Sequence, residues 1–167
     1  MLGKPDYDQA VKWYRKGAAQ GQRDAQYGLG VRYARGEGVS IDPVEARRLF
    51  TAAAEHGLAE AQLGLAIMLE QGAGGAADPA LAIHYFQLAA DHGMSQAQFR
   101  LGVLLASRKE PGSDRVSAYQ WLKLSQSSIK ESAPVLTDLR KSMSETEVAE
   151  AERRVDQWRA AHPRGQP

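Results

Sequence analysis

The sequence contains no cysteine, which excludes disulfide bonds, thiol catalysis and thiolate metal sites. It also lacks any apolar run of the roughly 18 to 20 residues that would span a bilayer. An excess of one charge is missing too, because 21 Lys and Arg residues face 20 Asp and Glu residues. Without a strong positive field, nucleic acid and anionic lipid are not attracted to the molecule as a whole. We therefore expect no nucleic-acid partner and no membrane insertion.

What is present is ordinary for a globular protein, with 43% hydrophobic and 25% charged residues. The length of 167 residues suits one domain, so residues 1–167 are predicted to form a single domain. The N-terminal residues do not have the pattern of a signal peptide, although a cleaved precursor would leave the same sequence. The cellular compartment stays open: a soluble protein, cytoplasmic as written or periplasmic if a signal peptide was removed.

An internal repeat of 36 residues runs through the chain. Alanine recurs at this interval, at Ala10, Ala46, Ala82 and Ala118. A pair of bulky residues follows each alanine, in the same order: Trp13-Tyr14, Leu49-Phe50, Tyr85-Phe86 and Trp121-Leu122. The first three pairs are followed in turn by Gly21, Gly57 and Gly93. The pairs Ala25-Gln26, Ala61-Gln62 and Ala97-Gln98 share the period. Such a period indicates stacked copies of one structural unit.

Each unit is predicted to be a pair of helices. Asp42-Pro43 and Asp78-Pro79 have the pattern of helix starts, with Asp as N-cap and Pro at the first helical position. Apolar residues recur every three or four positions from 42 to 57, which is typical of one face of an amphipathic helix, and a second helix follows Gly57. A single helical hairpin cannot bury this face, so the hairpins must stack.

The last unit differs from the others, as the end of a repeat array requires. It keeps Ala118, Trp121 and Leu122 but loses the later glycine and Ala-Gln signals. The segment Ser144-Glu145-Thr146-Glu147 has the form of a capping box and predicts a helix to about His162. The expected units are residues 6–41, 42–77, 78–113, a partial fourth at 114–143, and a capping helix at 144–162.

The repeated motifs resemble the Sel1-like repeat family. The resemblance rests on Ala10-x-x-Trp13-Tyr14, Ala18-Ala19-Gln20-Gly21, Ala25-Gln26-x-x-Leu29-Gly30 and Gly36-Glu37-Gly38-Val39, and it extends over about residues 6 to 126. It implies an all-α, right-handed superhelical solenoid related to tetratricopeptide repeats, a bacterial source, and a non-catalytic adaptor or scaffold. The third loop, Arg108-Lys109-Glu110-Pro111-Gly112, departs from the family pattern.

The first helix begins near Asp6 with nothing ahead of it to cover the face on which an earlier hairpin would pack. Two interpretations stay open, namely self-association through this end and a longer repeat array from which the sequence is a part.

Candidate binding residues follow from the expected geometry, in which the first helices of the units line the concave groove. Two rows of side chains are then predicted to be exposed and to contact a partner: Val11, Arg47, Ile83 and Tyr119, and Arg15, Thr51, Gln87 and Lys123. They vary while the core repeats, which is typical of a specific surface on a common scaffold.

The sequence offers no constellation for catalysis, metal or cofactor binding. His56 and His92 occupy equivalent places in adjacent units, on the order of 10 Å apart, too far to share one metal ion. The serines near Ser125 have no activating histidine beside them. Our leading hypothesis is therefore a scaffold that binds a partner protein or peptide in the groove. The alternative, a cell-envelope glycan-binding or wall-associated component, needs exposed aromatic residues there, and only Tyr119 offers one.

Overall fold

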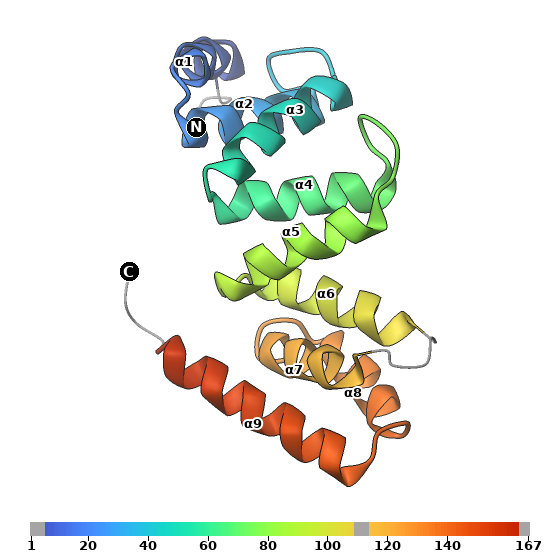
Figure 1. Cartoon of the computed structure of the whole chain (residues 1–167). Helices are drawn as coiled ribbons and strands as arrows, with labels where there is room; N and C mark the ends of the chain where they lie inside the picture. Colours follow the sequence, from blue (N-terminus) through green and yellow to red (C-terminus); the bar gives the residue numbers. More distant parts are fainter. Residues whose placement is uncertain (1–5, 109–113, 164–167) are drawn as a thin grey trace, which may run out of the picture. The chain divides into compact units, whose positions relative to one another are not determined.

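The computed structural model describes residues 6–108 and 114–163, and within these ranges it contains nine α-helices and no strand (Figure 1). The all-α prediction is confirmed. The helices are α1 (Tyr7–Ala19), α2 (Arg23–Arg35), α3 (Pro43–Glu55), α4 (Ala59–Gln71), α5 (Pro79–Asp91), α6 (Ser95–Ser107), α7 (Arg115–Ser125), α8 (Ser132–Arg140) and α9 (Glu145–Ala161). None of the helices in these ranges combines the length and the apolar composition of a membrane-spanning segment.

The helices follow the 36-residue period of the sequence. The first helices α1, α3, α5 and α7 begin at residues 7, 43, 79 and 115, and the second helices α2, α4 and α6 begin at 23, 59 and 95. Helices α1 to α6 have 13 residues each. The predicted helical hairpins are confirmed. The third loop, at 109–113, lies outside the described residues.

Aspartate caps start the first helices as the sequence predicts. The side chain of Asp42 accepts a hydrogen bond from the backbone N–H of Glu45 at 3.0 Å, and Asp114 accepts one from Ser117 at 2.8 Å. The carboxylate of Asp6 does the same for Gln9. Each bond satisfies one of the N–H groups that a helix start leaves without an intrahelical partner.

The core repeats with the same period. Ala46, Ala82 and Ala118 are all 0% exposed. Phe50 and Leu122, four positions after Ala46 and Ala118, each pack onto a glycine of a second helix. A Cβ added at Gly30 would lie 2.8 Å from the Phe50 ring, and one added at Gly102 would lie 2.7 Å from Cγ of Leu122. Small residues thus allow the helices to approach closely, and larger ones fill the remaining space.

The chain divides into two compact units, residues 1–88 and 89–167. In the first unit, α2 packs against both α1 and α3, and α3 packs against α4. In the second, α7 packs against α6, α8 and α9. That the whole chain forms a single domain stays a prediction.

The predicted capping helix is present as α9, and its capping box is complete: Ser144 Oγ accepts from the Glu147 backbone N–H at 3.2 Å, while the Glu147 carboxylate accepts from the Ser144 N–H at 2.8 Å. Helix α8 has only 9 residues, so the fourth hairpin is shorter than the others. Val148 and Ala151 of α9 lie in one buried cluster with Ala118 and Tyr119 of α7. Helix α9 therefore covers α7.

Candidate interaction surface

Two of the eight predicted groove residues are buried, and the prediction of their exposure was wrong. Val11 is 3% exposed and belongs to a core cluster with Leu29 and Leu49. Val39, in the loop between α2 and α3, packs against this cluster. Tyr119 is 4% exposed because α9 covers it. These two positions contribute to the core of their units.

Tyr119 is held by a polar contact as well as by packing. Its hydroxyl donates a hydrogen bond of 2.7 Å to Oε1 of Glu152 on α9. Burial first, and then this hydrogen bond, raise the pKa of Tyr119 to about 12. The aromatic residue on which the glycan-binding alternative depended is thus unavailable for stacking on a sugar.

Three further groove candidates are engaged within the molecule. Nη1 of the half-buried Arg47 donates to the carbonyl of Ala76 at 3.0 Å, so Arg47 holds the loop that follows α4. Thr51 Oγ1 donates to the Arg47 carbonyl at 2.8 Å. Lys123 pairs with Glu152 at 3.3 Å. Reversing the charge of Arg47 or Lys123 would therefore disturb the structure itself.

Ile83 and Gln87 lie on α5 and are half-buried. Their role in binding a partner stays a prediction.

Arg15 is the predicted groove residue that remains exposed. Its Nη2 donates a hydrogen bond of 3.3 Å to the hydroxyl of Tyr33, near the end of α2. Tyr33 also interacts electrostatically with Arg48 of α3, where it contributes, after the hydrogen bond to Glu45, to raising the pKa of Arg48. Side chains from α1 and α2 thus meet on the surface of the first unit.

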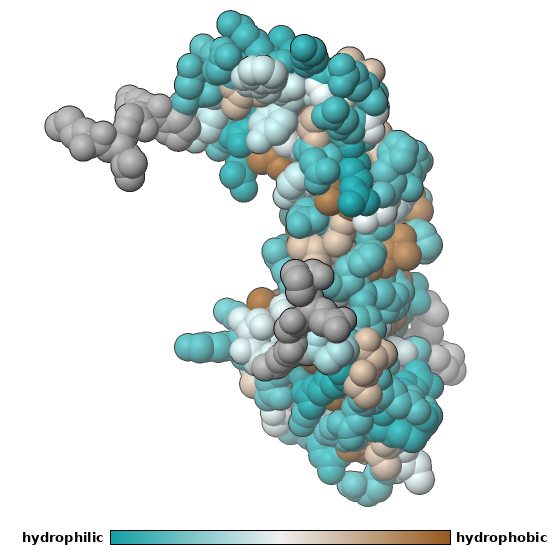
Figure 2. Space-filling model, turned by 90° about the vertical axis from the view of Figure 1, so that its left-hand side faces the viewer, coloured by the Kyte–Doolittle hydropathy of each residue, from teal (hydrophilic) through white to brown (hydrophobic). Residues whose placement is uncertain are grey.

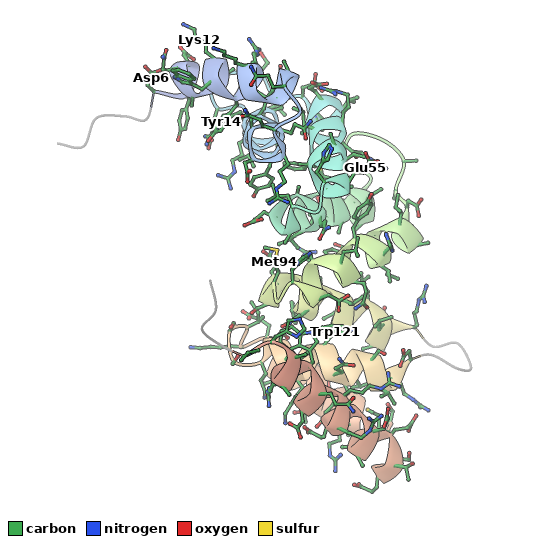
Figure 3. The ribbon with its side chains drawn as sticks, turned by 60° about the vertical axis from the view of Figure 1, so that its left-hand side comes forward. Asp6, Lys12, Tyr14, Glu55, Met94 and Trp121 are labelled. Atoms are coloured by element: carbon green, nitrogen blue, oxygen red, sulfur yellow. The ribbon has the colours of Figure 1, made fainter. Side chains whose placement is uncertain are left out.

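We call this surface the α1–α3 face. The name covers the exposed residues Arg15, Val44 and Arg48 and the half-buried residues Tyr33 and Thr51, which lie on α1, α2 and α3. Val44 is 64% exposed, one turn before Arg48 on α3, and it gives the surface an apolar part. Figure 3 shows Lys12 on the side of α1 opposite Tyr14, whose ring packs on Gly28 of α2. The side of the chain visible in Figure 2 is mostly hydrophilic, with apolar residues in small groups.

One carboxylate already contacts the α1–α3 face. Glu45 accepts from Nε and Nη2 of Arg48 at 2.8 and 2.6 Å. These hydrogen bonds are the main reason that the pKa of Glu45 is lowered. Because the Arg48 side chain is 64% exposed, the pair contributes only about 0 to 1 kcal/mol to stability. It can open at little cost when another carboxylate binds.

Sequence reasoning missed Tyr33, Val44 and Arg48. Val44 and Arg48 were detectable, since both lie opposite the buried Ala46 and Phe50 on the helical wheel of α3. Tyr33 was not, because only the fold brings the end of α2 between α1 and α3.

Charged contacts also join α9 to α7. Arg115 pairs with Glu147 at 3.1 Å, and Nη1 of Arg154 donates to Ser117 Oγ at 3.4 Å. Burial acts to raise the pKa of Glu152, but hydrogen bonds from Tyr119 and Lys123 outweigh it and lower the pKa. The ionised form of Glu152 is therefore favoured where α9 meets α7.

The described residues offer little for catalysis. No three His, Cys, Asp or Glu side chains among them lie close enough together to hold a metal ion. A depression of about 460 Å³ in the second unit is lined by Val103, Ala106, Val135 and Leu139, and Asp138 is the one carboxylate among its described lining residues. A second, of about 370 Å³, is lined by Leu124, Trp158, Arg159 and His162. Among the lining residues that the structure describes, neither depression contains the pair of an acid and a base that general acid–base catalysis requires.

Comparison with protein families gives a clear match. The family model of the Sel1 repeat matches residues 1–22, 23–58, 59–94 and 95–125. Each complete unit of the family model begins with a second helix and ends with the first helix that follows it, as α2 and α3 do. The sequence analysis instead begins each unit with the first helix, as in the pair α1 and α2. The 36-residue period is the same in both descriptions.

Solved structures of the same kind are similar to this chain. A Sel1 repeat protein from Oxalobacter formigenes has a TM-score of 0.73 and 28% sequence identity, covering 81% of this chain and 56% of that one. A protective antigen of uropathogenic Escherichia coli strains, with an SLR fold, has a TM-score of 0.64 and 25% identity, covering 95% of this chain and 42% of that one. This chain therefore spans about half the length of these proteins. No curated protein matches it.

Proposed function

Because the chain belongs to the Sel1 repeat family, we propose that it is a scaffold that binds a partner protein or peptide on the α1–α3 face. Sel1 repeats commonly serve as protein-interaction scaffolds, and their fold is typically non-catalytic. One observation supports the choice of this surface: the exposed Arg15 of α1 and Tyr33 of α2 are joined by a hydrogen bond of 3.3 Å, which holds a cation and a phenol together where a partner can reach them.

The repeat pattern supports the proposal. Core positions keep their residue type from unit to unit, as at Ala46, Ala82 and Ala118. Positions outside the core do not, since Arg15 is replaced by Thr51 in the next unit. Folding requires the repeating residues, whereas the varying exposed residues are available to recognise a partner.

Affinity capture from a lysate of the source organism tests the proposal. We expect wild type to retain a protein that the double variant Arg15→Glu/Arg48→Glu loses, because both changes reverse charges at the centre of the face. Both side chains are exposed, so the variant should keep the helix content of wild type by circular dichroism. Lys130→Glu/Lys141→Glu, two exposed lysines of the second unit, is the matched control. If the folded Arg15→Glu/Arg48→Glu variant captures the same protein equally well, the proposed surface is wrong.

A further inference from the structure

Trp13 on α1 departs from the repeat in its burial. It is 65% exposed, whereas Leu49, one 36-residue repeat later on α3, is 2% exposed, and Trp121, three repeats later on α7, is 4% exposed. Ala10, three positions before Trp13, shows the same difference, since it is half-buried while Ala46 is 0% exposed. One side of the first helix is thus exposed on α1 and buried on α3.

On α3 this side of the helix packs against the second helix that precedes it. Leu49 lies in a buried cluster with Leu29 of α2. The ring of Phe50 lies between two glycines: a Cβ added at Gly30 of α2 would be 2.8 Å from the ring, and one added at Gly64 of α4 would be 3.2 Å from it. Each glycine allows its helix to approach Phe50 closely. A first helix inside the stack is therefore held by the second helix before it and by the second helix after it.

On α1 only half of this arrangement is present among the described residues. Tyr14 is the equivalent of Phe50, and Gly28 of α2 is the equivalent of Gly64. A Cβ added at Gly28 would be 2.5 Å from the Tyr14 ring. Helix α1 lies at the edge of the first unit, with α2 between it and α3 (Figure 1). In the described part of the chain no helix precedes α1 to supply the equivalent of Gly30, and Tyr14 stays half-buried.

We propose that this surface, which we call the Trp13 face and which consists of Ala10, Trp13 and Tyr14, binds the second helix of a Sel1-type hairpin of a partner protein. The Trp13 face continues the interface that α3 forms with α2, which determines the occupant. The partner helix carries a glycine against Tyr14, as Gly30 lies against Phe50, and an apolar residue against Trp13. The Trp13 face is separate from the α1–α3 face, so this inference goes beyond the proposed function.

A second copy of this chain is a poor source of that helix. Inside the stack, a second helix is followed by the first helix on which it packs, as α2 is by α3 and α6 is by α7. Helix α8 is different, because α9 follows it and packs on α7. However, α8 carries the exposed Asp138 three repeats after Gly30, where close approach requires a glycine. The occupant is therefore assigned to another protein.

The border of the Trp13 face is polar. Lys16, one turn after Trp13, is exposed, whereas Leu124, three repeats after Lys16, is buried. The exposed Gln9 lies one turn before Trp13. An apolar centre with a polar rim is typical of surfaces that are exposed to water until a partner binds.

Fluorine NMR of the full chain containing fluorotryptophan tests the proposal, since the sequence has three tryptophans and Trp13→Phe identifies the signal of Trp13. The probe is a synthetic peptide with the sequence of residues 23–41, which comprise α2 and its loop. We expect the peptide to shift the Trp13 signal alone. Gly30→Leu in the peptide should weaken binding at least tenfold by overpacking against Tyr14. Because leucine forms helices better than glycine, this loss cannot come from lost helicity. Arg35→Leu, at the exposed end of α2, is the matched control and should bind like the unchanged peptide.

A joined chain decides the question without depending on the affinity of a free peptide. Residues 23–41, placed directly ahead of Asp6, keep the 36-residue period and make the contact intramolecular. The Trp13 signal of the joined chain should differ from that of wild type, and Gly30→Leu in the added copy should restore it. An unchanged Trp13 signal in the joined chain would overturn the proposal. A Trp13 signal that shifts when wild type alone is concentrated would assign the surface to a second copy, and would overturn it as well. Arg15→Glu/Arg48→Glu should bind the peptide like wild type, so the Trp13 face and the α1–α3 face are tested separately.

Discussion

Replacing Leu122 with alanine is expected to lower the free energy of unfolding of the second unit by about 3 kcal/mol, within the range of 2 to 5 kcal/mol for a buried leucine. Leu122 is 0% exposed and lies in the cluster that joins α7 to α8 and α9. The loss combines the transfer of the side chain with the cavity that it leaves. Urea denaturation followed by circular dichroism measures the change.

Gly102 offers a second variant that tests the same contact. A methyl group at Gly102 would lie 2.7 Å from Cγ of Leu122 and 3.1 Å from its backbone nitrogen, so Gly102→Ala alone should cost about 1 to 3 kcal/mol by overpacking. In the double variant Gly102→Ala/Leu122→Ala the added methyl group fills part of the cavity. The double variant should thus lose clearly less than the sum of the two single losses. Strict additivity would show that the two residues do not touch.

The second large effect is expected at Gly74, in the loop that follows α4. Its φ is +71°, and an added Cβ would lie 2.2 Å from the carbonyl oxygen of Pro43 at the start of α3. Gly57 has nearly the same φ, +76°, but nothing within 4 Å of an added Cβ. Gly57→Ala should therefore cost about 1 to 2 kcal/mol, the penalty of a left-handed conformation. Gly74→Ala should cost about 2 kcal/mol more, because the loop must also move away from α3.

Thermal and urea denaturation of the two glycine variants give the comparison directly. Equal losses for Gly57→Ala and Gly74→Ala would contradict the close packing of the loop on α3. The consequence extends to the α1–α3 face, since Arg47 of α3 also holds this loop through Ala76. A displaced loop would disturb the helix that carries Val44 and Arg48.

The repeat was predictable because packing imposes it on the sequence. Wherever two helices cross closely, a small residue such as Ala46 or Gly102 is required, and wherever a helix starts, a side chain such as Asp42 caps it. Both requirements depend on local geometry and recur with each unit. The capping box of α9 could be predicted from the sequence for the same reason.

The exposed surface was less predictable, because contacts between distant segments decide it. Val11 has the helical position of a groove residue, but Val39 and the loop around it cover that position. The helical position of Tyr119 also predicts a groove residue, because the sequence pattern does not show that α9 packs on α7. The sequence pattern places Arg15 on the surface of α1, but its hydrogen-bond partner Tyr33 becomes a neighbour only in the folded chain.

Amide hydrogen exchange shows whether this chain binds a partner protein through the α1–α3 face, when it is compared for the chain alone and in complex with the protein that it captures. Binding should slow exchange in α1 (Tyr7–Ala19), in α3 (Pro43–Glu55) and at the end of α2 around Tyr33. Unchanged exchange in these segments, with protection confined to α4, α6 or α8, would contradict the claim.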